Sequence, residues 1–453
     1  MYTNLVDIVV LVFFMVFCVF KPKIGILSVF GLILFFPVAF SFFGISFGQG
    51  QKYLPNVFII EIFFFIIFLF RKKNILSDSL DVLIIVYMLL VFLISLFTSK
   101  FTLDLGVFVK QFLMFPLFYF MGKIYITRPS NDKWLKVFIN VLMFLGIYMI
   151  FLIIFEYFTK LNIMAFLETN FMKMVGSQVV SDPFNQIRDQ IRSNYFRAIG
   201  PQLEPTEAAL IVFISFVVYL IWQIKRNMKL FFVKEIILFT LFLLIIILGT
   251  RTIILMMFVS LLFYFFYLQQ NKLKLLRHSF ILLFVGGVIT LLIYLGFFNR
   301  IFFDFQNSAY FVDRINDEGT IYSRIFAWQF AINQIYSHII FGVGVGIPIY
   351  ALDYKGASIF TTHNLFLDDL LFQGFFLFII LIIIWVKLIK NDNKIIKLSK
   401  DKFHLKIAKL HILLFVGMII FGIFSPEKLQ ISSLFWFIGG INRQQLNMEG
   451  IKL

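Results

Sequence analysis

Long apolar runs separated by short polar segments dominate the pattern of residues along the chain. Most runs contain roughly 15–25 residues, close to the length that a helix needs to cross a bilayer core about 30 Å thick. They do not alternate apolar with polar residues as barrel strands would, so they predict transmembrane helices. The candidate spans are residues 4–20, 24–43, 57–70, 82–97, 106–121, 135–158, 206–224, 233–249, 253–268, 280–298, 363–386, 407–424 and 431–441.

The composition excludes most other classes of protein. Of the 453 residues, 61% are hydrophobic and only 14% are charged, whereas a soluble domain carries about 25% charged residues. Such a chain cannot cover the surface of a soluble multidomain enzyme, and it is too apolar to be disordered. With one cysteine it is no disulfide-rich scaffold. We predict an all-α, polytopic integral membrane protein with about 12–14 transmembrane helices.

The net charge of +16 arises mostly from alternate short loops. Residues 71–73, 123–136 and 225–234 are rich in lysine and arginine, and residues 387–406 hold seven lysines. The positive-inside rule places these loops in the cytoplasm, with the N-terminus outside and the C-terminus inside. Because no nucleic-acid-binding motif accompanies the basic residues, we expect no nucleic-acid partner.

Two long segments, 159–205 and 299–362, interrupt the spans, and both fall on the extracytoplasmic side of this topology. The remaining organisation is membrane helices over 1–158 and 206–298, then further helices and a cytoplasmic tail over 363–453. Loops of this length are uncommon unless they are functional. Chemistry is therefore expected on the extracytoplasmic side.

Two candidate segments precede the second loop. The segment 197–206 contains Arg197 and Glu204 and leads into a helix start at Pro205, which is also consistent with a rigid turn and its capping residues. Arg251 lies in a very short hinge between two spans. An arginine at membrane depth is a functional candidate by default, although an arginine that anchors the helix at the interface fits as well.

Two more candidates lie in the second loop and just after it. On a helix, Arg324 and Trp328 share one face at i, i+4, and the glycine run 342–346 favours a turn with close backbone approach over a dinucleotide fingerprint. In the segment 361–369, a threonine is expected to cap a membrane helix. The helix N-terminus then favours a neutral His363 that acts as a base, unless His363 is only an interface residue.

Metal binding has little support in the sequence. It contains neither a closely spaced histidine pair nor a cysteine cluster. Asp368 and Asp369 are adjacent, so on a helix they diverge by about 100° and do not form one ligand set. We predict no metal and no other cofactor.

Together, these segments resemble the O-antigen ligase and O-antigen polymerase superfamily of membrane glycosyltransferases. The resemblance covers roughly residues 195–385. The matching pieces, in order, are Arg197-x-x-Gly200 with Pro205; Thr250-Arg251; Arg324-x-x-x-Trp328 leading to Gly342-x-Gly344-x-Gly346; and His363-Asn364-x-x-Leu367 with Gly374.

The resemblance implies transfer of a glycan from an undecaprenyl-diphosphate carrier on the outer side of the bacterial inner membrane, without metal. It implies His363 as the base and Arg251 and Arg324 as diphosphate ligands, with Arg197, Trp328 and Asn364 binding substrate. Glu204 or Asp317 would orient sugar hydroxyls. A chain-length regulator and a flippase in the same membrane are the expected partners.

The family leaves alternatives open. A polymerase adds the growing chain to one new lipid-linked repeat unit, and we favour it for O-antigen or a related surface polysaccharide. A ligase transfers the glycan to lipid A core instead. A flippase or other transporter is the alternative from another class, because Glu61, Lys110 and Glu156 lie inside predicted spans, although no internal repeat supports it.

Overall fold

The structure is a computed structural model, and it describes most but not all of the chain. The described residues are 20–35, 44–46, 53–71, 78–98, 114–126, 133–159, 191–192, 195–196, 205–222, 228–248, 250–268, 318–344, 351–352, 358–359, 362–399, 401–425 and 429–449.

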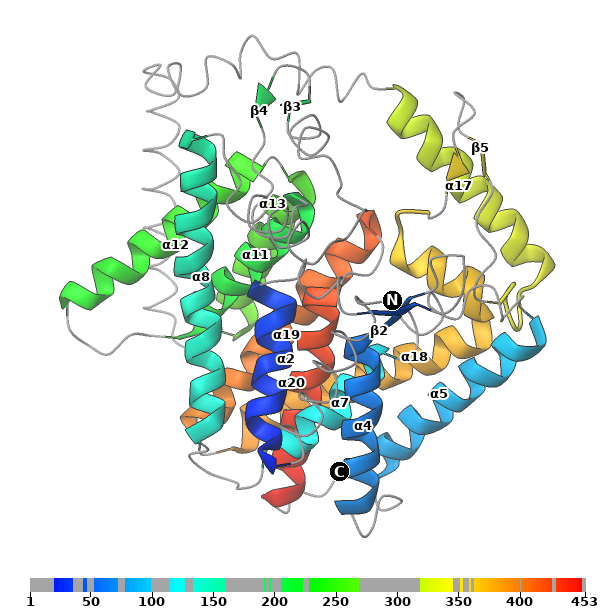
Figure 1. The fold of residues 1–453 in the computed structure, drawn as a ribbon, viewed down its shortest axis with the longest axis horizontal. Helices are drawn as coiled ribbons and strands as arrows, with labels where there is room; N and C mark the ends of the chain where they lie inside the picture. The colour runs from blue at the N-terminus through cyan, green and yellow to red at the C-terminus, as the bar shows by residue number, and fades with distance from the viewer. Residues whose placement is uncertain are drawn as a thin grey trace.

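Helices make up nearly all of the described chain (Figure 1). They are α2 (Pro22–Phe35), α4 (Asn56–Arg71), α5 (Ser79–Thr98), α7 (Met114–Tyr125), α8 (Lys133–Thr159), α11 (Pro205–Ile221), α12 (Met228–Leu248), α13 (Arg251–Phe263) with the π-helix η3 (Tyr264–Leu268), α17 (Glu318–Ser337), α18 (Leu365–Leu398), α19 (Lys402–Phe424) and α20 (Leu429–Met448). Short antiparallel pairs join β1 (Gly44–Ser46) to β2 (Tyr53–Pro55), β3 (Ile191–Arg192) to β4 (Tyr195–Phe196) and β5 (Ala351–Leu352) to β6 (Ser358–Ile359).

The predicted fold class is confirmed: the protein is an all-α, polytopic membrane protein. Four described helices, α5, α8, α18 and α19, are long and apolar enough to cross a bilayer. Most of the other predicted spans coincide with shorter or partly described helices. Two predicted spans, 4–20 and 280–298, lie essentially outside the described residues.

One predicted boundary is wrong. The span expected over 363–386 is the start of α18, which continues to Leu398 and so includes much of the lysine-rich segment assigned to a cytoplasmic loop. Lysine is a good helix former, and cations near a helix C-terminus interact favourably with its dipole. Hydropathy gives the length of the apolar run, whereas the helix continues past its end.

Glycines allow α7 and α20 to pack closely in the middle of the molecule (Figure 1). A Cβ at Gly122 would overlap the carbonyl of Phe437, and one at Gly440 would overlap the carbonyl of Tyr119. Small residues at such contacts are the usual means by which membrane helices approach each other, because lipid supplies no hydrophobic force between them.

Buried charges join three distant parts of the chain beside this contact. Asp78, just before α5, accepts hydrogen bonds from Arg443 Nε and Nη2 at 2.8 and 2.7 Å. Lys123 Nζ lies 2.9 Å from Asp78 Oδ2 and 2.6 Å from both oxygens of Asp81. Two carboxylates therefore balance two cations where water does not reach, and each ion is hydrogen-bonded.

A second buried pair joins α18, α19 and α20. His411 Nδ1 lies 2.6 Å from Asp392 Oδ2, and His411 Nε2 lies 2.8 Å from the carbonyl of Phe435. Asn442 Nδ2 donates to the other oxygen of Asp392 at 2.7 Å. Since a carbonyl oxygen only accepts, His411 Nε2 carries a proton in this arrangement.

We predict that Asp78→Asn lowers the free energy of unfolding by about 3–5 kcal/mol, because it leaves buried cations without a partner. Burial raises the pKa of Asp78, but the hydrogen bond from Arg443 and the charge of Lys123 lower it more, so the net pKa lies well below the usual range. The network therefore stabilises the fold fully above about pH 4, and its contribution is lost as the pH falls through the lower, folded-state pKa.

Thermal unfolding of the purified protein in detergent at pH 7 measures the loss. Glu449→Gln, which alters an exposed carboxylate just after α20, is the matched control and should unfold like the unmodified protein. Equal midpoints for the Asp78 and Glu449 variants would contradict the prediction.

Candidate functional site

The side chain of Trp328 brings α17 to the N-terminal end of α18. Its Nε1 donates a hydrogen bond to the carbonyl of Thr362 at 2.8 Å. Arg324 lies one turn earlier on the same helix and is half-buried, which agrees with the predicted shared face at i, i+4. The structure thus places Trp328 beside the start of the fourth segment, with Arg324 one turn away on the same helix.

Asn364, and not a threonine, is the N-cap of α18. Its Oδ1 accepts the backbone N–H of Leu367 at 3.0 Å, and its Nδ2 donates to the carbonyl of Ile423 in α19 at 3.1 Å. The expectation of a threonine cap is therefore wrong. Both residue types have short side chains that reach the first turn, so sequence alone does not separate them.

Thr362 instead supports a buried carboxylate. Its Oγ1 lies 2.7 Å from Asp368 Oδ1, and its backbone N–H donates to the same oxygen at 3.1 Å. Asp369 accepts a hydrogen bond from Gln373 Nε2 at 3.2 Å, and Tyr87 of α5 donates to Gln373 Oε1 at 2.8 Å. The two neighbouring aspartates thus have different partners.

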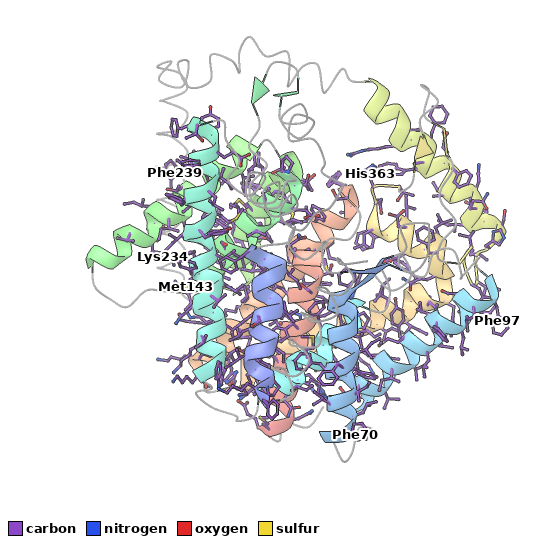
Figure 2. The ribbon with its side chains drawn as sticks, in the orientation of Figure 1. Phe70, Phe97, Met143, Lys234, Phe239 and His363 are labelled. Atoms are coloured by element: carbon purple, nitrogen blue, oxygen red, sulfur yellow. The ribbon has the colours of Figure 1, made fainter. Side chains whose placement is uncertain are left out.

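His363 lies between these anchored residues, at the N-terminal end of α18 and near the end of α19 (Figure 2). Its side chain is exposed, and its φ of 53° is the only positive value for a non-glycine residue in the described chain. Such a conformation costs free energy and persists where neighbouring contacts enforce it, often at functional sites. Here the hydrogen bonds of Thr362 and Asn364 hold the backbone on either side.

Gly374 breaks α18, and the segment after α17 fills the break. Gly374 has φ 72° and Gly342 has φ 69°. The N–H groups of Val343 and Gly344 donate to the carbonyls of Leu371 and Phe372 at 2.9 and 3.2 Å. In the other direction, the N–H groups of Phe375 and Phe376 donate to the carbonyls of Ile339 and Ile340 at 2.8 and 3.4 Å.

These four hydrogen bonds, which we call the backbone exchange, join the predicted glycine run to α18. A Cβ at Gly342 would lie 2.6 Å from the Gly374 nitrogen and from the Phe372 carbonyl oxygen. The close backbone approach expected of the run is therefore present at Gly342, where no larger residue fits. It holds α17, with Arg324, in a fixed position beside the first part of α18.

The backbone of Arg251 begins α13 and lies at the same end of the bundle as Ile423. Lys409 Nζ donates to the carbonyl of Leu268, and Gly417 lies against Met256. The residue numbers rise along one helix and fall along the other, so α13 and α19 are antiparallel. The start of α13 is therefore near the end of α19, which Asn364 contacts.

Glu207, in the first turn of α11, is a further acidic residue that the sequence did not single out for chemistry. Gln430 Nε2 at the start of α20 donates to its Oε2 at 3.0 Å. In the sequence, a carboxylate near a helix N-terminus indicates only a favourable interaction with the helix dipole. Its hydrogen-bond partner, Gln430, is 223 positions away, so no local pattern indicates the contact.

Three predicted site residues, Arg197, Glu204 and Asp317, lie outside the described residues. Within the described ranges, no three His, Cys, Asp or Glu side chains gather as a metal site would require. The absence of a metal and the roles of individual residues stay predictions.

We predict that Gly374→Ala destabilises the protein strongly, because the new Cβ would overlap the backbone of Ile340 and Gly342 and L-residues disfavour this φ. Gly31→Ala in α2 is the control, since nothing lies within 4 Å of its Cβ position. Thermal unfolding in detergent should show a lower midpoint for the first variant and an unchanged or higher one for the second. Equal midpoints would show that the backbone exchange contributes little.

The comparison with known families finds one similarity. Residues 236–382 match a family model described as O-antigen ligase. The matched segment includes Arg251, Arg324, Trp328, His363 and both glycines of the backbone exchange. A search of curated proteins found no match. Through this segment, about a third of its length, the chain is similar to the O-antigen ligase family, and the match supports the O-antigen ligase and polymerase superfamily.

Proposed function

We propose that the protein is a polysaccharide polymerase that joins undecaprenyl-diphosphate-linked repeat units into O-antigen or a related surface polysaccharide. The contact between Trp328 and Thr362 carries the proposal, because it puts the helix of Arg324 beside His363. The coarser statement, O-antigen ligase or polymerase type, comes from the family match. The proposed site faces the outside of the bacterial inner membrane.

The reaction requires a base and charge relief on a departing diphosphate. An acceptor sugar hydroxyl attacks the anomeric carbon, a new glycosidic bond forms, and the bond from that carbon to the diphosphate oxygen breaks. His363 takes the hydroxyl proton, a role commonly worth about 10²–10⁴-fold in rate. Arg324 and Arg251 bind the diphosphate oxygens as forked donors, and the carrier leaves as the diphosphate.

The structure offers His363 two features that suit a base. Its side chain is exposed, so an acceptor sugar can reach it. Its backbone is held between two anchored neighbours, so the point from which the imidazole projects is fixed before substrate binds. Positioning of this kind lowers the entropic cost of bringing the reacting groups together.

A ligase is the second candidate, because the matched family model is described as O-antigen ligase. A ligase and a polymerase share the donor, the leaving group and the need for a base, and they differ in the acceptor. We favour the polymerase because polymerases diverge more widely in sequence.

We predict that His363→Ala abolishes long-chain polysaccharide while the amount of protein in the membrane stays normal, because the acceptor loses its base. The readout is the length distribution of surface polysaccharide in cells that carry only the variant. His338→Ala is the matched control: His338 is also exposed, and its Nδ1 lies 3.2 Å from the carbonyl of Gln334, one turn earlier on the same helix. Polysaccharide of normal length in the His363 variant would remove this residue from the mechanism.

Deletion of the gene separates polymerase from ligase. Loss of a polymerase leaves lipid A core that carries a single repeat unit, because ligation continues without chain growth. Loss of a ligase leaves bare core, with polymer retained on the carrier lipid. We predict the first profile on an electrophoretic gel of extracted lipopolysaccharide, and the second would replace the polymerase proposal with the ligase.

A further inference from the structure

The segment that follows α17, residues 338–344, was expected in an extracytoplasmic loop, yet its backbone bonds to a helix that crosses the membrane. The four hydrogen bonds around Gly374 fix its depth, because they tie Ile339, Ile340, Val343 and Gly344 to α18. The depth of Gly374 in the bilayer therefore gives the depth of this segment.

The contact of Tyr87 with Gln373 shows how deep Gly374 lies in the bilayer. The Tyr87 hydroxyl donates to Gln373, the residue before Gly374, at 2.8 Å. Tyr87 lies near the middle of the span Ser79–Phe97 in α5. A residue halfway along a spanning helix lies near the middle of the bilayer whatever the tilt of the helix. The break in α18 is therefore deep in the membrane.

The direction of α17 agrees with this depth. Trp328 contacts Thr362 at the outer end of α18, and further along both segments Ile340 contacts Phe376. Residue numbers rise in the same direction along both segments, so the two segments are parallel. The helix α17 therefore runs from the outer surface toward the interior, beside the first part of α18. Figure 1 shows the two helices on the same side of the molecule as α5.

The side chains at the end of this path suit lipid. Ile339, Ile340 and Phe341 are 50, 58 and 51% exposed, and their neighbours Phe375 and Phe376 are 53 and 48% exposed. The second pair begins an exposed apolar stripe that continues down α18 through Ile379, Ile382, Ile383 and Val386. On a membrane helix such a stripe contacts acyl chains.

We propose that residues 338–344 form a re-entrant element, which enters the outer leaflet and presents Ile339, Ile340 and Phe341 to the acyl chains of the bilayer. Irregular backbone is tolerated at this depth only where its polar groups are satisfied. Here the break in α18 supplies donors for the carbonyls of Ile339 and Ile340 and acceptors for the N–H groups of Val343 and Gly344. The element anchors α17 in the membrane, independently of whether the protein transfers glycans.

Single cysteines test the depth. The chain has one cysteine, Cys18, so Cys18→Ser provides a background for Ile340→Cys. Two reference variants bracket it: Gln329→Cys, an exposed site on α17 near Trp328, and Phe376→Cys in the span. Each protein is reconstituted in phosphatidylcholine and phosphatidylglycerol vesicles and treated with a charged, membrane-impermeant maleimide. A fluorophore on each cysteine is then tested for quenching by nitroxide on the acyl chain.

We expect Ile340→Cys to react at least about tenfold more slowly than Gln329→Cys, because charged reagents are excluded from the bilayer core. Its fluorophore should be quenched by the acyl-chain nitroxide, like that at Phe376→Cys. Fast aqueous labelling would overturn the proposal, as would slow labelling without quenching, which indicates cover by a second copy of the chain. Quenching lost on addition of undecaprenyl phosphate would show a carrier-lipid site instead. Phe341→Cys repeats the test if the first variant fails to fold.

Discussion

The requirement that every backbone polar group find a partner in lipid governs how this molecule is built around Gly374. A helix broken inside a bilayer exposes carbonyl and N–H groups, and each unsatisfied group costs several kcal/mol. The residues after α17 provide donors for Leu371 and Phe372 and acceptors for Phe375 and Phe376. Each segment thus provides hydrogen-bond partners for backbone groups of the other, so the break in α18 and the segment after α17 depend on each other.

That dependence explains the positions of the candidate groups. Arg324 and Trp328 lie on the helix that the insertion anchors, and His363 precedes the helix that it breaks. The exchange at Gly374 fixes one end of the shared path, and the hydrogen bond from Trp328 to Thr362 fixes the other. Two constraints at separate depths leave little freedom for α17 to tilt or slide, which is what the proposed role of Arg324 requires.

The sequence predicted the helices well because apolar length is a local property. It also predicted the shared face of Arg324 and Trp328, and the close backbone approach at Gly342, since both follow from helix geometry and from glycine chemistry. It did not predict the partners of these residues. Tyr87 and Gln373 are 286 positions apart, and nothing near either residue indicates the other. The sequence also did not predict that α18 continues beyond residue 386, because lysines mark the end of the apolar run without ending the helix.

Buried polar groups follow the same rule as the backbone. Asp78 meets Arg443 and Lys123, Asp392 meets His411 and Asn442, and Asp368 meets Thr362. The first two groups join helices far apart in the sequence, and both resemble solvated loop charges when read from composition. Near His363 the pattern changes: the carboxylates are buried and bonded, while the imidazole is exposed. The imidazole proposed to act on substrate is exposed, as a base must be if the hydroxyl that it deprotonates is to reach it.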